Sequence, residues 1–153
     1  MTTLAESKGL LKEILESQRF AVLATLNNRQ PYSNLVAFAA SDDLRYFIFA
    51  TNRNTQKFHN ILTDDKVALL IDNRSNSQSD FSVALAITAL GTASEININN
   101  DTSEKLVQYY LSRHEVLADF LKGQETAIIH ISVTEYIIAR FDGAEHITVD
   151  DTF

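Results

Sequence analysis

The sequence predicts a mainly β fold, an antiparallel β-barrel of six or seven strands with added helices. Three strand-like segments with short polar links follow one another over residues 20–50, as in an antiparallel meander. A further long segment, residues 127–141, is rich in β-branched and aromatic residues. Strands and helices do not alternate as βαβ units, which argues against a doubly wound parallel sheet. The length of 153 residues, 45% of them hydrophobic, predicts a single domain over residues 1–153.

The first part of the chain contains a helix and the meander. Apolar residues at helical spacing predict an amphipathic helix over residues 4–18. Strands are predicted over 20–26, 31–40 and 44–50, separated by turns rich in Asn and Asp. Pro31 is the only proline, and it opens the second strand, where its missing N–H is tolerated.

A second helix is predicted directly after the meander. Asn54 or Thr55 can cap it, and its apolar face would include Phe58, Ile61 and Leu62. The elements expected after it are, in order, a strand over 67–71, a long strand over 81–96 bent at Gly91, helices over 102–111 and 116–121, a strand over 127–141 and a returning strand over 145–149.

The segment between the two middle strands, residues 73–80, contains no apolar residue. Such a polar segment is either mobile or organised by a ligand or a partner.

Charge and composition exclude several classes of function. The net charge of −7 makes nucleic acid a poor partner, because binding to a phosphate backbone needs a basic surface. The apolar runs are too short to span a membrane, and no signal peptide is visible, so a cytoplasmic protein is expected. The absence of cysteine removes disulfides and thiolate chemistry.

The histidines do not predict a metal site, since no two of them have metal-ligand spacing. His59 is expected on the helix surface, although it lies two residues past Lys57 and could approach a ligand. His114 and His146 are expected at the surface, and His130, which lies in a strand, in the core or an interface.

The turn before the second helix carries an unusual pair of charges. Arg53 precedes the helix and Lys57 lies in its first turn, where the helix dipole favours acids. A bound phosphate would resolve this conflict, because amide donors, hydroxyls and two cations would converge on one anion. The alternative is an ordinary turn with two solvated cations, with Lys57 reaching Asp64 or Asp65.

Three stretches together resemble the pyridoxamine 5'-phosphate oxidase-like proteins, a family of FMN-binding split barrels. The first is an apolar strand, polar turn, proline and second strand over residues 22–38. The second, residues 50–61, has a hydroxyl residue, a spacer, a lysine and a following asparagine. The third is the turn and strand over residues 64–71. The order and spacing of the three are more specific than any one alone.

The resemblance implies a homodimer with one FMN in each of two clefts between the subunits. It implies that Lys57 binds the phosphate, with Thr55 beside it and Thr51 and Arg53 on the approach. It further implies that residues of the second strand border the isoalloxazine ring, namely Asn34, Leu35 and Val36. Polar contacts to the phosphate or the ribityl chain would come from the middle loop, at Asn73 and Arg74.

Three functions remain open at the level of sequence. The first is an FMN-dependent oxidoreductase with an unknown substrate, for which a reduced nicotinamide is a plausible electron donor. The C-terminal arginine and histidine pattern expected of the true oxidase is missing, and Arg140 stands alone near the end, which disfavours oxidation of pyridoxamine phosphate. The second is a binding module for FMN, F420 or haem without turnover. The third is a structural dimerisation domain.

Overall fold

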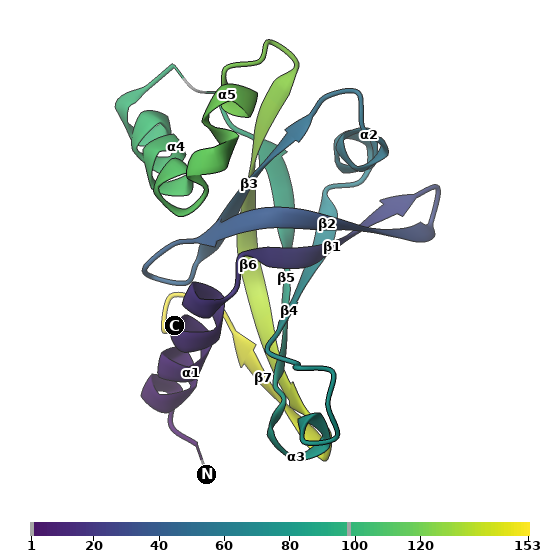
Figure 1. The fold of residues 1–153 in the computed structure, drawn as a ribbon, viewed down its shortest axis with the longest axis vertical. Helices are drawn as coiled ribbons and strands as arrows, with labels where there is room; N and C mark the ends of the chain where they lie inside the picture. Colours follow the sequence, from purple (N-terminus) through teal and green to yellow (C-terminus); the bar gives the residue numbers. More distant parts are fainter. Residues whose placement is uncertain (1, 98) are drawn as a thin grey trace.

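A computed structural model describes residues 2–97 and 99–153. Its elements, coloured along the chain in Figure 1, are α1 (Leu4–Ser17), β1 (Phe20–Asn27), β2 (Gln30–Ala40), β3 (Tyr46–Asn52), α2 (Gln56–Thr63), β4 (Lys66–Asp72), α3 (Asp80–Val83), β5 (Ala86–Glu95), α4 (Asp101–Arg113), the 3-10 turn η1 (Glu115–Leu117), α5 (Ala118–Leu121), β6 (Thr126–Arg140) and β7 (Gly143–Thr148).

The predicted antiparallel barrel is confirmed. The strands pair in the order β3-β2-β1-β4-β5-β6-β7, and an additional pairing of β3 with β6 closes six of them into a barrel. Strand β6 is 15 residues long. Its first half pairs with β3 and its second half with β7, so β7 extends the sheet beyond the barrel.

Alternate residues of the strands fill the barrel interior, among them Leu23, Phe38, Phe49, Leu69 and Ile129. The register between β5 and β6 shifts at Leu90/Gly91, as the predicted bend at Gly91 requires. An added Cβ at Gly91 would overlap the carbonyl oxygen of Ser132 and lie 2.9 Å from the Cγ2 atom of Ile131. Glycine is therefore required for the close approach of these two strands.

Helix α4 covers the outer face of the barrel at β2 and β3 (Figure 1). The hydroxyls of Tyr109 and Tyr110 donate hydrogen bonds to the carbonyl oxygens of Ala40 and Ala37. His114 is buried, and its Nε2 atom lies 2.7 Å from the carbonyl oxygen of Phe38, so the predicted surface position of His114 is wrong. These side-chain contacts with carbonyl oxygens of β2 hold α4 against the barrel.

Two predicted strand boundaries are wrong. Residues 81–83 are not strand but part of α3, and β5 begins only at Ala86. Leu44 does not begin the third strand, because it has a φ angle of +63° and lies in the turn before Tyr46. Both segments adjoin polar turns, whose local hydrogen bonds outweigh the β propensity of their apolar residues.

The polar segment 73–80 is organised by the chain itself. The carboxylate of Asp80 accepts hydrogen bonds from the backbone N–H groups of Ser75, Asn76 and Ser77. These contacts with Ser75 lower the pKa of Asp80. The segment is therefore ordered by its own hydrogen bonds, a third possibility beside the two that the sequence left open.

None of the helices in the described part of the chain has the length and apolarity needed to cross a bilayer.

Candidate functional site

Helix α2 covers one end of the barrel, at the end of β3 (Figure 1). Thr55 is its N-cap and accepts a hydrogen bond from the N–H of Phe58, which settles the choice between Asn54 and Thr55. Phe58 and Ile61 are buried, as predicted, but Leu62 is 65% exposed and does not belong to the buried face. The buried residues fix the helix over the barrel and leave its first turn at the rim.

A buried polar contact anchors α2 to β1. The side-chain amide of Asn60 donates to the Thr25 hydroxyl over 3.0 Å. The Asn60 carbonyl oxygen accepts from the Gln56 side chain over 2.7 Å. This contact was not predicted, although an asparagine between the apolar Phe58 and Ile61 was a signal for it.

Two predicted hydroxyls meet at the start of α2. The Oγ1 atoms of Thr51 and Thr55 lie 3.2 Å apart. Thr55 donates its proton to the carbonyl oxygen of Asn52 over 2.7 Å. Thr51 therefore acts as the donor in the Thr51–Thr55 pair, and its proton is the one that a bound anion could attract.

Lys57 lies in the first turn of α2 and is half-buried. Burial lowers the pKa of its ammonium group. The ion pairs found among residues 2–97 and 99–153 do not include Lys57, so neither Asp64 nor Asp65 neutralises it there. A partly desolvated cation near a helix N-terminus is favourable only when an anion joins it.

Arg53 is directed to other partners. Its guanidinium forms an ion pair with Glu95 and donates to the carbonyl oxygen of Gln124 over 2.9 Å. Its backbone N–H donates to Glu125 over 2.8 Å. These contacts tie the turn before α2 to the end of β5 and the start of β6, so the predicted convergence of Arg53 with Lys57 is not seen in this structure.

The predicted residues of β2 lie on two faces. Asn34 pairs with Leu23 and Val36 with Ala21, which places both on the inner side of the barrel. The side-chain oxygen of Asn34 is buried and has no hydrogen-bond partner among the described residues. Leu35 points outward and is 66% exposed.

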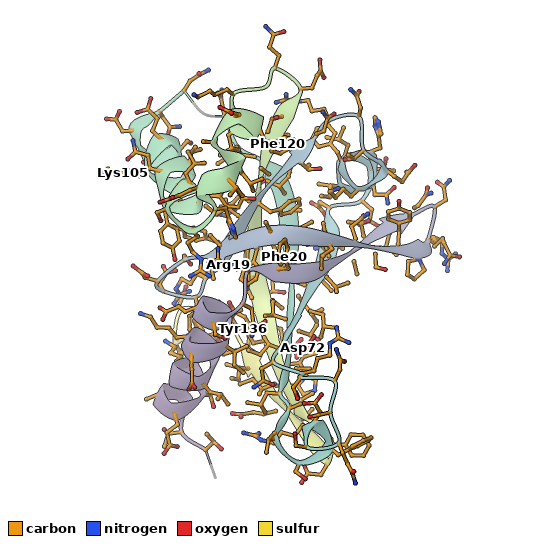
Figure 2. The ribbon with its side chains drawn as sticks, viewed as in Figure 1. Arg19, Phe20, Asp72, Lys105, Phe120 and Tyr136 are labelled. Atoms are coloured by element: carbon orange, nitrogen blue, oxygen red, sulfur yellow. The ribbon has the colours of Figure 1, made fainter. Side chains whose placement is uncertain are left out.

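Asn73 and Arg74 lie away from α2, beyond the other end of β4 (Figure 1). The Asn73 side chain accepts from the N–H of Leu85 over 2.7 Å, and the Nε atom of Arg74 pairs with Asp72 over 2.9 Å. Figure 2 labels Asp72 in this half of the molecule. One chain therefore brings Thr51, Thr55 and Lys57 together but leaves Asn73 and Arg74 apart from them.

Two of the remaining histidines differ in their exposure. His59 is exposed on α2, and His130 stacks on Tyr46 with ring centroids 4.9 Å apart. Burial lowers the pKa of His130. No group of three or more potential metal-ligating side chains comes together in the part of the chain that the structure describes.

Solved structures share the fold across almost the whole chain. The heme binding protein from Mycobacterium smegmatis aligns with a TM-score of 0.81 at 14% identity, covering 97% of this chain and 59% of that one. General Stress Protein 26 from Bacillus anthracis aligns with a TM-score of 0.70 at 21% identity, covering 94% and 98%. A FAD-binding protein from Mesorhizobium loti aligns with a TM-score of 0.68 at 14% identity, covering 83% and 87%.

The chain thus spans only 59% of the mycobacterial protein but nearly the full length of the Bacillus protein. No curated protein matches the sequence. The model of one family, described as Pyridoxamine 5'-phosphate oxidase, matches residues 8–138 and so includes the barrel, α2 and α4. The chain therefore belongs to the pyridoxamine 5'-phosphate oxidase family.

Proposed function

We propose that this protein binds FMN and that the first turn of α2 holds the FMN phosphate. The observation that carries the proposal is Lys57, a half-buried cation without an ion-pair partner among the described residues. A phosphate dianion would stabilise its charged form, and Thr51 would add a hydrogen bond. Thr55 contributes by capping the helix that presents Lys57.

Arg53 has a conditional role in this proposal. Its ion pair with Glu95 would have to open before its guanidinium could approach the phosphate. Lys57 therefore supplies the positive charge that is available without rearrangement. Arg53 would strengthen FMN binding only after its guanidinium left the Glu95 carboxylate for the phosphate.

Asn34 fits the ring side of the same ligand. Its side-chain oxygen lacks a partner among the described residues, and a buried acceptor left without a donor costs about 1–3 kcal/mol. Rotation of the amide can present either its oxygen or its nitrogen, so a polar edge of the isoalloxazine could satisfy it. Leu35 and Val36 would supply apolar and backbone contacts beside Asn34.

A second copy of the chain would complete the site. Outward-facing Leu35, Val22 and Leu70 lie in a row, because Val22 pairs with Leu35 on one side and with Leu70 on the other. Leu35 and Leu70 are exposed, and Val22 between them is half-buried. This apolar row across three strands supports a homodimer interface. In such a dimer, Asn73 and Arg74 of one protomer would serve the FMN held by Lys57 of the other.

The proposed activity is an oxidoreduction with FMN as the redox group. FMN, when bound, accepts and donates electrons, and the protein supplies binding, orientation and electrostatics. Lys57 would hold the phosphate, residues 34–36 would border the ring, and the apolar row would exclude water. A reduced nicotinamide is the proposed electron donor, and a cytoplasmic location stays a prediction.

The second candidate is a binding module without turnover, for flavin, F420 or haem. Two structural neighbours, a heme binding protein and a FAD-binding protein, favour this alternative. Under the haem alternative, the exposed His59 on α2 would be the first candidate for an iron ligand.

The absorption spectrum of the purified protein, followed by titration of the cofactor-free protein with FMN, tests the proposal. We expect flavin bands and an FMN affinity that falls about 10- to 100-fold in Lys57→Gln, because a charge-assisted hydrogen bond contributes about 1.5–3 kcal/mol. Lys66→Gln, at an exposed lysine outside the site, is the matched control.

Reduction by NADH or NADPH would then separate an oxidoreductase from a flavin-binding module. A Soret band that His59→Ala abolishes would favour haem instead. Equal FMN affinity in the wild type and Lys57→Gln would show that the phosphate site is wrong.

A further inference from the structure

The largest apolar hollow among the cavities described lies away from α2. It has a volume of about 620 Å³ and is lined mainly by apolar side chains. This size falls in the range of sites for small organic ligands. Its floor is the outer face of β5 and β6, at Ala86 and Ala139. Leu70 of β4, which also belongs to the apolar row of the proposed interface, lines the hollow as well.

The floor of this hollow is built from small residues. Ala86 and Ala139 are opposite each other in neighbouring strands, and Ala84, the C-cap of α3, also lines the hollow. Methyl groups in place of larger side chains leave a broad, shallow space. A flat ring fits such a space better than a bulky branched molecule does.

Two phenylalanines line the hollow, and both are unusually accessible. Phe81 and Phe141 are 62% and 77% exposed, and their rings meet edge to face with centroids 4.9 Å apart. Exposed aromatic rings beside a hollow are typical of ligand contacts, because an added ring can pack on them by the same geometry.

Three of the four charged residues that line the hollow already have partners. Asp72 is paired with Arg74, and Asp80 accepts hydrogen bonds from the amides of the 75–77 turn. Arg140 also lines the hollow, and it takes part in none of the ion pairs found among residues 2–97 and 99–153. A carboxylate on the ligand would be a natural partner for this guanidinium.

We propose that this hollow binds a planar aromatic carboxylate, with its ring over Ala86 and Ala139 and its carboxylate at Arg140. The proposed function puts Arg74, on the same rim, beside the FMN of the partner. A ligand in the hollow would then lie near that FMN and could be the substrate. Its identification as a substrate rests on the proposed function, whereas the binding itself does not.

Titration of the cofactor-free, full-length protein with 2-naphthoate tests the binding. Isothermal calorimetry gives the affinity, and amide chemical shifts of Ala84, Ala86 and Ala139 give the location. The neutral 2-naphthalenemethanol has the same ring without the charge. We expect it to bind at least about tenfold more weakly than 2-naphthoate.

Three variants separate the ring contact, the charge and the FMN site. We expect Arg140→Gln to weaken 2-naphthoate binding about tenfold or more and leave the weaker binding of the alcohol unchanged. Ala139→Leu, which fills the floor, should abolish binding of both. Lys57→Gln should change neither, even though it is expected to weaken FMN binding.

No shift at Ala84, Ala86 and Ala139, or equal affinity in Arg140→Gln and the wild type, would overturn this inference. Binding of 2-naphthoate with those shifts in a protein that fails to bind FMN would support the aromatic anion site and reject the proposed cofactor. Stimulation of FMN reduction or reoxidation by the bound carboxylate would support its role as a substrate.

Discussion

The side-chain amide of Asn60 donates a hydrogen bond to the hydroxyl of Thr25 over 3.0 Å, where each residue is only 2% exposed. This contact joins α2 to β1 across 35 residues of sequence. Lys57 lies on the same short helix, one turn before Asn60. The position of the proposed phosphate-binding turn therefore depends on this buried hydrogen bond at the end of the barrel.

Thr25→Val tests this anchor. The substitution keeps the shape of the side chain but leaves a buried N–H of Asn60 without an acceptor, so we expect the free energy of unfolding to fall by about 1–3 kcal/mol. Urea denaturation measures the change. Thr63→Val, at an exposed threonine of the same helix, should stay within about 0.5 kcal/mol of the wild type. Equal stability of the two variants would contradict the anchor.

A second buried hydrogen bond holds the turn before β3. The hydroxyl of Tyr136, labelled in Figure 2, donates to the carbonyl oxygen of Leu44 over 2.7 Å. Leu44 has a positive φ angle, which is unfavourable for a leucine and needs support from its surroundings. We expect Tyr136→Phe to lower the free energy of unfolding by about 1–3 kcal/mol, measured by urea denaturation.

Tyr32→Phe, at an exposed tyrosine, is the matched control and should be nearly neutral.

Burial also raises the pKa of Tyr110 to about 12, and raises the pKa of Tyr136. The unfolded chain loses these phenol protons near pH 10, while the folded protein keeps them. Stability should therefore fall as the pH rises above about 10, and less steeply in Tyr136→Phe.

Strand pairing and local caps explain why much of the fold could be predicted from the sequence. The 20–50 meander, the α1 helix and the final hairpin depend on neighbouring residues, and their periodicity is visible in the sequence. Closure of the barrel between β3 and β6 joins segments about 80 residues apart, and no local pattern encodes it. The barrel itself was predicted from the meander, the number of strands and the absence of βαβ units.

The candidate site was only partly accessible to sequence reasoning. The positive charge of Lys57 could be recognised as unusual from the sequence, because the helix dipole favours acidic residues in the first turn of a helix. The partners of Arg53 were not, because Glu95 and Gln124 lie far from it in sequence. The burial of His114 was missed for the same reason, since its partner Phe38 belongs to a distant strand.

Replacement of glycine by alanine is expected to have opposite effects on the free energy of unfolding at Gly91 and at Gly9. Gly91→Ala would force a Cβ against the backbone of Ser132, so we expect a loss of several kcal/mol or failure to fold. Gly9 lies in α1 with no atom within 4 Å of an added Cβ. Gly9→Ala should therefore raise the free energy of unfolding by about 0.5–1 kcal/mol. Thermal unfolding of both variants checks the contrast, and a neutral Gly91→Ala would contradict the close strand approach.

Lys57 is expected to strengthen FMN binding without stabilising the cofactor-free protein. Burial lowers its pKa, so the charged side chain is disfavoured in the protein without ligand. We expect Lys57→Gln to leave the melting temperature of the cofactor-free protein unchanged or raise it, and to lose the stabilisation that added FMN gives the wild type. Differential scanning fluorimetry with and without FMN measures both effects. A lower melting temperature without FMN would assign Lys57 a structural role instead.

The last prediction concerns the exposed apolar row and the proposed second copy. Leu35→Asp places one carboxylate per protomer at the proposed interface without disturbing the core, because Leu35 is exposed in the single chain. An unpaired buried charge is costly, so we expect the dimer dissociation constant to rise by about 100-fold or more. Light scattering after size exclusion should show the mass falling from two chains to one.

The matched control for this change is Val116→Asp, at a residue of η1 that is 92% exposed and distant from the row. It should remain dimeric. If the second copy supplies Asn73 and Arg74 to the cofactor, Leu35→Asp should also weaken FMN binding in proportion to the dimer lost, and raising the protein concentration should restore both. Monomeric wild type, or a monomeric Leu35→Asp that binds FMN at full affinity despite the aspartate beside the ring, would contradict a site shared between two chains.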